Sequence, residues 1–362
     1  MGQGSSPTVK EFRVRAVRAP MVEPHRTASG VVAESPLVLT DITTDSGVVG
    51  RSITFTYTPA ALVPTATFIR NLEPLVVGEP LAPAAIAGKL SARLRLLGTQ
   101  GLVGMALAGI DMALWDALAR THGVSLTGML GGVVRPIPAY GAVGYDGPDG
   151  AARTAERLAG RGFRGMKAKI GYPTVAEDVA VVRAMRDAAG PGVTLMVDYN
   201  QSLTPAEASA RMRVLDAEGL AWVEEPTLAH DFDGNARVAR EAVTPVQCGE
   251  NWWGPLDLRH AIDAGASDLV MPDVMKIGGV TGWMQAAAIA HVHAIPVSSH
   301  LWPEVSARLL CCTPTAHWLE YSDWWNPIMA EPLVIDGGMT QVSNEPGSGI
   351  DWNESAVQKF QI

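Results

Sequence analysis

The sequence predicts an α/β protein in which a parallel β/α barrel is joined to a smaller α+β domain. Between residues 137 and 320, short apolar runs alternate with stretches of helical periodicity, the pattern of repeated strand–helix units. Polar residues end successive runs at steps of 26, 26, 23, 27 and 20 residues, which is about one β/α unit each. These residues are Asp198, Glu224, Glu250, Asp273, His300 and Glu320.

The first 132 residues have a different pattern and are predicted to form the α+β domain. Residues 37–44 and 48–57 are rich in β-formers and flank Asp45-Ser46-Gly47, which indicates a hairpin. Residues 20–35 form a polar, turn-rich stretch before the first of these runs. Helical periodicity follows, and the predicted helices cover residues 59–77, 82–97 and 102–120.

Residues 133–325 are predicted to form the barrel domain, with eight strands, the last of them weak in pattern. The predicted strands are residues 137–143, 165–170, 193–198, 220–224, 246–250, 269–272, 295–299 and 315–320. A barrel gathers the carboxyl ends of its strands at one face, so the polar residues there should meet. The tail, residues 326–362, holds a short apolar run and a Gly337-Gly338 turn, and we expect it to fold back onto the first domain.

Composition excludes several classes of protein. The chain of 362 residues is 47% hydrophobic and 18% charged, which suits an enzyme with a large core. Its net charge is −9 and its charged residues form no long run, which argues against nucleic-acid binding. No membrane contact is expected, because no apolar stretch reaches the length of a span and no signal peptide begins the chain. The cysteines Cys248, Cys311 and Cys312 have no CxxC spacing and indicate a reducing cytoplasm.

Three acidic residues stand at the ends of neighbouring predicted strands, namely Asp198, Glu224 and Glu250. Carboxylate oxygens that converge from adjacent strands suit Mg²⁺, which keeps positions open for water or substrate. Zinc is disfavoured, because neither cysteine nor histidine is among these three. The alternative is that single acids are solvated loop residues, but the near-equal spacing of all three favours a magnesium site.

Two lysines and one histidine are candidate bases. Lys167 and Lys169 share one face of a strand with α-carbons roughly 6–7 Å apart, where two charges repel by about 2.5 kcal/mol at an effective dielectric near 20. That repulsion would lower one lysine pKa toward pH 7–8, about two units. Asp273 at the preceding strand end would accept from one nitrogen of His300 and leave the other as a base. The alternatives are a solvated lysine pair and a packed histidine.

Six motifs in this order resemble the mandelate racemase subgroup of the enolase superfamily, over nearly the whole chain. They are Lys167-Ala-Lys169, Asp198-Tyr-Asn200, Glu224-Glu-Pro, Gly249-Glu250-Asn, Pro272-Asp273-Val-Met-Lys276 and Ser299-His300-Leu. Gly109-Ile-Asp111 and Trp115-Asp116 add to the resemblance in the first domain. The resemblance implies a (β/α)7β modified TIM barrel and a capping domain built from the N-terminus and the C-terminal tail.

The resemblance also implies the role of each site residue. Asp198, Glu224 and Glu250 would bind Mg²⁺. Lys169 would be the base on one face of the substrate, and His300 with Asp273 the base on the other. Lys167 and a protonated Glu320 would contact the substrate carboxylate, and Asn200 would lie near its 2-hydroxyl. Each residue thus keeps the role that its motif has in the family.

These roles imply Mg²⁺-dependent abstraction of the α-proton of a 2-hydroxy carboxylate through an enediolate. Racemisation of mandelate or a related acid is the expected reaction, and dehydration of an aldonate or aldarate sugar acid is the alternative. A catalytically silent metal-binding or assembly protein is disfavoured, because the set of bases and ligands is complete. The resemblance also implies a homo-oligomer such as an octamer.

The sequence departs from the family's racemase pattern at the expected substrate pocket. Ala142 stands where a serine is expected to help bind the carboxylate. The stretch of residues 20–32, expected to cover the site, carries His25, Arg26 and Ser29 in place of aliphatic contacts, although Val32 and Tyr57 suit an apolar group. His25, Ser29, Val32 and Tyr57 are therefore predicted substrate contacts, with solvent-facing polar side chains as the alternative.

Overall fold

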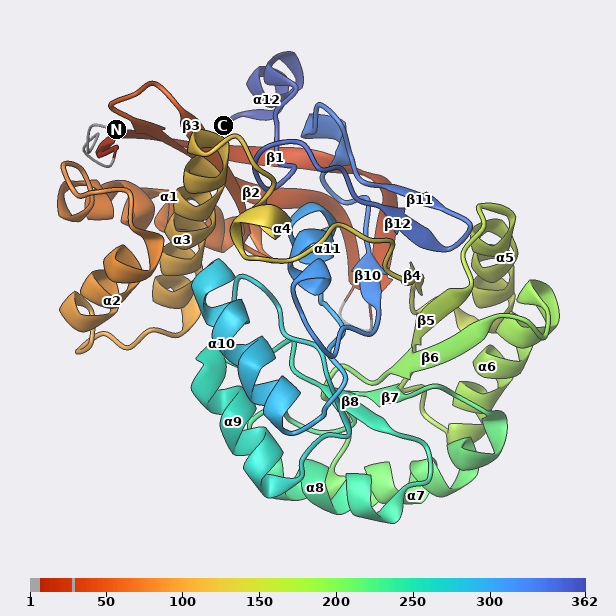
Figure 1. Ribbon diagram of the computed structural model, residues 1–362. Helices are drawn as coiled ribbons and strands as arrows, with labels where there is room; N and C mark the ends of the chain where they lie inside the picture. Colours follow the sequence, from red (N-terminus) through yellow and green to blue (C-terminus); the bar gives the residue numbers. More distant parts are fainter. Residues whose placement is uncertain (1–6, 28–29) are drawn as a thin grey trace.

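The N-terminal domain of the computed structural model, which describes residues 7–27 and 30–362, is an antiparallel sheet covered by helices (Figure 1). The sheet has the order β1-β2-β3. Its elements are β1 (Val9–Thr27), β2 (Gly30–Thr44), β3 (Val49–Phe55), α1 (Pro59–Leu72), α2 (Pro83–Arg93) and α3 (Gly101–Thr121). The predicted turn at Asp45-Ser46-Gly47 is confirmed, since the Thr44 N–H donates to the Val48 carbonyl across it.

The prediction of a turn-rich stretch at residues 20–35 is wrong. β1 continues to Thr27 and β2 starts at Gly30, with His25 opposite Val32 and a register irregularity between Pro20 and His25. Antiparallel pairing satisfies the backbone groups of both arms, so the polar side chains are carried on strands. The described part of the pair reaches the barrel, where the Arg26 carbonyl accepts the Tyr145 N–H at 3.1 Å.

α3 also corrects an expectation. This helix of 21 residues is long and apolar enough to cross a membrane by length and composition, which contradicts the prediction that no stretch reaches that length. Of its most apolar 18-residue stretch, 72% is buried inside the protein. The helix packs there against α1, α2, α10 and β3. α3 is therefore the core helix of the N-terminal domain.

The barrel has seven parallel strands and seven helices among the described residues (Figure 1). Its strands are β4 (Ala139–Val143), β5 (Gly165–Lys169), β6 (Thr194–Asp198), β7 (Val223–Glu224), β8 (Val246–Cys248), β9 (Leu269–Val270) and β10 (Leu319–Tyr321). Its helices are α5 (Gly147–Gly160), α6 (Val175–Ala189), α7 (Pro205–Leu215), α8 (Phe232–Glu241), α9 (Gly254–Ala264), α10 (Gly279–Val292) and α11 (Pro303–Cys311). The weak eighth run is confirmed as β10, which pairs with β4.

Residues 295–299 close the barrel without forming a regular strand. Val297 makes parallel bridges to Val270 on one side and to Ala316 on the other. The Val297 N–H donates to Thr315 and the Ser298 N–H to Val270, so this segment joins the two edges of the sheet. Seven β/α units followed by β10 give the predicted (β/α)7β form of the TIM barrel.

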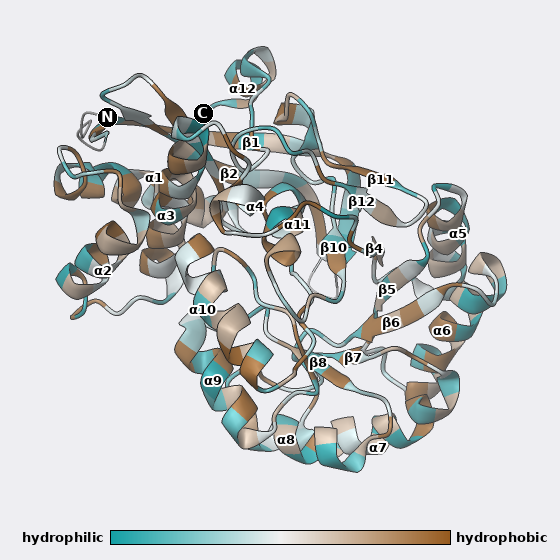
Figure 2. Cartoon of the chain, viewed as in Figure 1, coloured by the Kyte–Doolittle hydropathy of each residue, from teal (hydrophilic) through white to brown (hydrophobic). Residues whose placement is uncertain are grey.

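Hydropathy follows this architecture. Figure 2 shows mostly hydrophobic residues on β6 and β8, and alternating hydrophilic and hydrophobic residues on the surrounding helices. The two helices after β5 and β6 begin at capping boxes, Thr174 with Glu177 and Thr204 with Glu207, in which side chain and backbone bond reciprocally. These caps fix where the loops that follow β5 and β6 end.

The C-terminal tail returns to the N-terminal domain. It consists of the short helix η3 (Asn326–Ile328), the hairpin β11 (Val334–Asp336) and β12 (Met339–Gln341), and α12 (Glu354–Phe360). The buried Arg15 pairs with Asp41 at 2.7 Å and with Glu354 of α12 at 2.6 Å, and the Ile362 N–H donates to Ala16. Divisions at residues 132 and 325 remain predictions, although the tail contacts β1.

Candidate active site

Three carboxylates meet where the sequence predicted a metal site. Asp198 ends β6 and lies opposite Glu224, which ends β7, and Glu250 follows β8. One oxygen of each lies within 4.8 Å of the others, and all three side chains are buried. Parallel strands place their carboxyl ends at the same edge, and this geometry brings the side chains together.

The cluster fits a magnesium ion. All three groups offer the hard oxygen ligands that Mg²⁺ prefers. Glu250 Oε2 is buried without a hydrogen-bond donor among the described residues, and the nearest cationic group is His300 Nε2 at 3.3 Å. Burial raises the pKa of Glu224 well above its usual value, whereas the charges of Lys169 and His300 help to hold the pKa of Asp198 and of Glu250 below theirs. A divalent cation would offset the cost of ionising Glu224.

Lys167 and Lys169 reach the same carboxylates from β5. Lys167 Nζ bonds Glu224 and lies 2.9 Å from Glu320 Oε1, and Lys169 Nζ lies 2.6 Å from Asp198 Oδ2. The prediction of a lowered lysine pKa is wrong for the contacts that the structure shows, in which the pKa of both lysines is raised. Burial and Lys167 would lower the pKa of Lys169, but Asp198, Glu250 and Glu224 together raise it more, so the net shift is upward. A cation on Asp198 would weaken that attraction.

His300 lies beside Asp273 as predicted. Its Nδ1 is 2.7 Å from Asp273 Oδ2, and the other Asp273 oxygen accepts the N–H groups of Met275 and Lys276. The carboxylate is therefore fixed by the backbone and in turn orients the imidazole with Nε2 toward Glu250. Burial would lower the pKa of His300, but Glu250, Glu320 and Asp273 raise it above its ordinary value.

Glu320 differs from the expectation of a protonated donor. It is the middle residue of β10 and contacts Lys167, and its Oε2 accepts the Leu301 N–H at 3.1 Å. Burial would raise the pKa of Glu320, but the charges of Lys167 and His300 lower it to about 2. Its carboxyl is thus ionised in the free protein, and its protonation would require added negative charge, such as a substrate carboxylate.

The two candidate bases lie across the barrel from each other. Lys169 belongs to β5, while His300 follows the segment that bridges β9 and β10. In the barrel order this segment is three steps from β5 in one direction and five in the other. Lys169 touches the cluster at Asp198 and His300 at Glu250, so the carboxylates separate the two bases.

Aromatic side chains from the N-terminal domain and from the stretch after β10 form a row at this site. Tyr57 packs on Phe55 with ring centres 4.8 Å apart, Phe55 on Trp324 at 5.6 Å, and Trp324 on His25 at 5.2 Å. The Tyr57 hydroxyl donates to Asp273 Oδ2 at 3.3 Å. Burial and Lys169 lower the pKa of His25 to about 4, so its ring is neutral near pH 7.

Three further residues were predicted to contact the substrate, namely Val32, Asn200 and Ser29. Val32 pairs with His25 on the β1–β2 arm and is half-buried. Asn200 is exposed, and its backbone N–H donates to Asp198 Oδ1 at 2.7 Å. Ser29 lies outside the described residues. The structure thus places Val32 on the arm that carries His25, and Asn200 beside a carboxylate of the cluster.

A second polar network beside the metal site was not predicted. Asn251 donates to both oxygens of the buried Glu225, at 2.8 and 2.9 Å, and to Glu250 at 3.2 Å. Lys276 Nζ donates to the Asn251 side chain at 2.6 Å and lies 4.6 Å from the Tyr57 ring centre. Glu225, Asn251 and Lys276 all belong to the sequence motifs. The lysine three positions after Asp273 was the signal that could have revealed this network.

Comparison with known proteins gives matches along nearly the whole chain. Residues 9–131 match the family described as mandelate racemase / muconate lactonizing enzyme, N-terminal domain. Residues 150–356 match the enolase C-terminal domain-like family. The second match alone covers more than half of the 362 residues.

Solved structures and curated relatives agree with these matches. An enolase from Bradyrhizobium, complexed with magnesium and mandelic acid, is 44% identical, with a TM-score of 0.96 and coverage of 99% of both chains. L-Talarate dehydratase from Polaromonas, complexed with Mg and L-glucarate, is 28% identical, with a TM-score of 0.92 and coverage of 99% and 98%. D-Galactarolactone cycloisomerase of Agrobacterium fabrum is 31% identical, with 97% of this chain and 99% of that protein covered.

Proposed function

Since the chain belongs to the mandelate racemase / muconate lactonizing enzyme family of the enolase superfamily, we propose that it racemises an aryl-substituted 2-hydroxy carboxylate such as mandelate. The general reaction, Mg²⁺-dependent abstraction of a proton from a carboxylic acid, is that of the family. Isomerases and dehydratases both occur among the relatives. The proposal concerns the substrate and the outcome of the reaction.

The observation that carries racemisation is the placement of two bases on opposite sides of the carboxylate cluster. Lys169 lies beside Asp198 and His300 beside Glu250. A 2-hydroxy acid held at the cluster would present its α-carbon between them. One base would take the α-proton from one face while the other returns a proton to the opposite face, which inverts the centre.

The other residues would hold the substrate and its developing charge. Lys167 and Glu320 lie 2.9 Å apart and would bind the carboxylate, with Glu320 protonated once that anion is present. Asp273 would keep the His300 proton on Nδ1, so that Nε2 exchanges a proton with the substrate. Mg²⁺ on Asp198, Glu224 and Glu250 would supply positive charge for the enediolate that deprotonation produces.

An aryl substituent is supported by the aromatic row. One end of the row is Tyr57, whose hydroxyl donates to Asp273, the partner of His300. The other end is His25, which interacts electrostatically with Lys169 and Glu320. Phe55 and Trp324 lie between the two ends. Such a row suits a flat apolar group better than a polyhydroxylated chain. The relative from Bradyrhizobium, with 44% identity, was solved with mandelic acid.

Sugar-acid dehydration is the second candidate, and a separate observation favours it. A cavity of about 100 Å³ beside Ala142 is lined by polar residues that include His25, Arg26, Asp146 and Ser322. Such a lining could bind hydroxyl groups. L-Talarate/galactarate dehydratase of Salmonella typhimurium is 31% identical, with 74% of this chain and 68% of that protein covered. One base would then remove the α-proton, and His300 would protonate the leaving β-hydroxyl as water.

The test is α-proton exchange in D₂O with Mg²⁺, followed by NMR and polarimetry. The panel holds both mandelate enantiomers and a set of aldonic and aldaric acids. Racemisation predicts deuterium incorporation and loss of optical rotation with mandelate. Formation of a 2-keto-3-deoxy acid from a sugar acid, with mandelate inert, would replace racemisation by dehydration.

Assembly and location remain predictions from the sequence. A homo-oligomer, such as an octamer, predicts a particle several times the mass of the chain in gel filtration with light scattering. The cytoplasmic prediction rests on three cysteines that are free thiols in the structure.

A further inference from the structure

We infer that Asp178 is a positioning residue that holds together the two loops that carry Lys169 and Asp198. Asp178 lies in the first turns of α6, outside the carboxylate cluster, and is completely buried. The proposed function gives it no role. One of the two tests of this inference, the exchange of mandelate, rests on the proposed function. The other test requires only Mg²⁺ binding.

The first oxygen of Asp178 holds the loop after β5. Its Oδ1 accepts the N–H groups of Gly171 and Tyr172, both at 2.9 Å. Gly171 is two residues beyond Lys169 and has φ +108°, a conformation that favours glycine. The carboxylate therefore fixes the chain immediately after the base that would face one side of the substrate.

The second oxygen holds the loop after β6. Asp178 Oδ2 accepts the Tyr199 hydroxyl at 2.8 Å and Arg211 Nη1 at 2.6 Å. Tyr199 follows the metal ligand Asp198 directly. Arg211 also donates to the Tyr172 carbonyl at 2.8 Å, so it ties the first loop to the same carboxylate. One buried side chain thus accepts four hydrogen bonds from both loops and from α7.

The two loops also pack directly on each other. A Cβ at Gly171 would lie 3.0 Å from Ser202 Oγ and 3.5 Å from the Tyr199 ring, both in the loop after β6. Since the loops touch, a shift of one moves the other. Loss of the Asp178 bonds should therefore displace the side of the site that contains Lys169 and Asp198, and leave His300, which is held by Asp273, in place.

The experiment compares Asp178→Asn with a matched control, Asp216→Asn. Asp216 also accepts two loop N–H groups, from Val243 and Thr244, but it does so before β8 begins, at the opposite end of the barrel. The measurements are thermal unfolding, the Mg²⁺ dissociation constant by calorimetry, and deuterium exchange of each mandelate enantiomer. Lys169→Ala identifies the enantiomer that Lys169 serves.

Asp178→Asn is expected to weaken Mg²⁺ binding at least fivefold and to slow exchange of the Lys169-served enantiomer at least tenfold more than the other. Asp216→Asn should change the thermal stability but neither the Mg²⁺ affinity nor the relative exchange rates of the two enantiomers. Equal loss for both enantiomers with unchanged Mg²⁺ affinity would overturn the inference. If the wild-type protein exchanges neither enantiomer, the proposed function fails and Mg²⁺ affinity alone decides the inference.

Tyr199→Phe covers the case in which Asp178→Asn does not fold. This change removes only the hydroxyl that reaches Asp178 and keeps the ring. A smaller weakening of Mg²⁺ binding in the same direction supports the inference. Unchanged Mg²⁺ affinity in a folded Tyr199→Phe protein overturns it.

Discussion

His300 is oriented before any substrate arrives, because Asp273 holds it at 2.7 Å and two backbone N–H groups hold Asp273. His300→Asn should therefore remove one of two bases without disturbing the other. We expect racemisation to fall by about 10²–10⁴-fold, the usual contribution of a general acid–base group. Exchange of one mandelate enantiomer through Lys169 should continue. Deuterium incorporation into each enantiomer, measured by NMR, checks this.

Lys169→Ala is the mirror-image control and should preserve exchange of the opposite enantiomer. Circular dichroism and Mg²⁺ titration would confirm that both variants fold and bind metal. If His300→Asn abolished exchange of both enantiomers while Mg²⁺ remained bound, the two residues would not act as independent bases.

At the same scale, residue identities were predictable but their charge states were not. Asp198, Glu224 and Glu250 follow from their places at strand ends. The pKa of Lys169 depends on a 2.6 Å contact with Asp198, and that of Glu320 on Lys167 at 2.9 Å. The prediction from sequence took the size of the shift from repulsion between the two lysines and could not weigh the opposing carboxylates, because the distances to them are set by the folded barrel.

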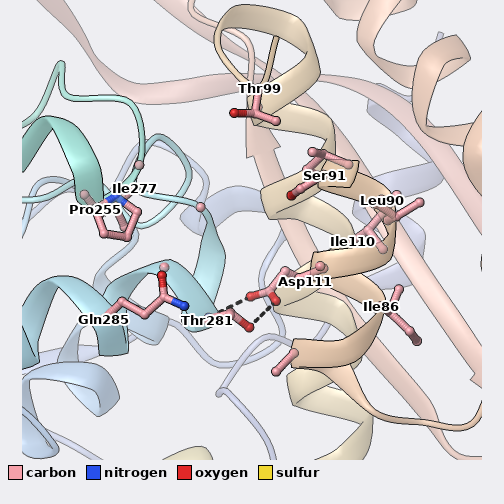
Figure 3. A pocket seen from close by; sticks show the side chains of 18 of the residues that line it. Ile86, Leu90, Ser91, Thr99, Ile110, Asp111, Pro255, Ile277, Thr281 and Gln285 are labelled. Carbon is pink, nitrogen blue, oxygen red and sulfur yellow. Dashed lines mark hydrogen bonds between the residues drawn. The ribbon is translucent and has the colours of Figure 1, made fainter. Parts of the chain in front are cut away.

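Among the elements, α10 is capped by another domain. Its N-cap residue, Gly278, has no side chain, and Asp111 of α3 accepts the Thr281 N–H at 3.0 Å and the Thr281 hydroxyl at 2.5 Å. Figure 3 shows this pair at the edge of a cavity between α2, α3, α9 and α10. A carboxylate at a helix N-terminus replaces the missing cap. Asp111 thereby joins the N-terminal domain to the barrel.

This cap should make stability depend on pH. Burial raises the pKa of Asp111 to about 7, although its bonds with Thr281 and Val280 lower it. The native state then holds a proton that the unfolded chain releases near pH 4, so stability falls as pH rises from about 4 to 7. Full ionisation would cost about 4 kcal/mol for this one group, from about three pKa units. Urea unfolding of wild type and Asp111→Asn at pH 5 and pH 8 measures it.

Asp111→Asn keeps an oxygen that can accept the Thr281 N–H and cannot ionise. The free energy of unfolding of the variant should therefore change less between pH 5 and pH 8 than that of the wild type. An equal pH dependence in both proteins would mean that Asp111 is already ionised at pH 5.

The elements themselves were predictable to different degrees. α3 and β10 follow from periodicity and spacing. The β1–β2 arm at residues 20–35 did not, because proline and polar side chains suggest turns while long-range pairing decides the strand. Residues 295–299 read as a strand, yet only Val297 makes bridges. Closure of the barrel decides that geometry, and it involves Val270 and Ala316, which are distant in sequence.

In the whole molecule, the two ends of the chain stabilise the domain that supplies most of the aromatic row. Asp41 accepts from Arg15 and from the Trp352 indole at 2.7 Å each, and Arg15 also pairs with Glu354. The tail is thus tied to the same sheet that carries Phe55. Since the bases come from the barrel and Phe55, Tyr57 and His25 from this domain, the complete site requires both domains.

Metal binding should also be visible in the stability of the whole molecule. Asp198, Glu224 and Glu250 lie at the ends of three neighbouring strands, and burial strongly disfavours the ionised form of Glu224. Mg²⁺ at 100 times its dissociation constant should stabilise the native state by about 2.7 kcal/mol, which raises Tm by about 5 °C for a chain of this size. Calorimetric scans with Mg²⁺ and with EDTA measure the shift. Glu250→Gln removes one ionised ligand and should shrink the shift, whereas Asp216→Asn should retain it; an unchanged Tm in saturating Mg²⁺ for the wild type would exclude this cluster as the metal site.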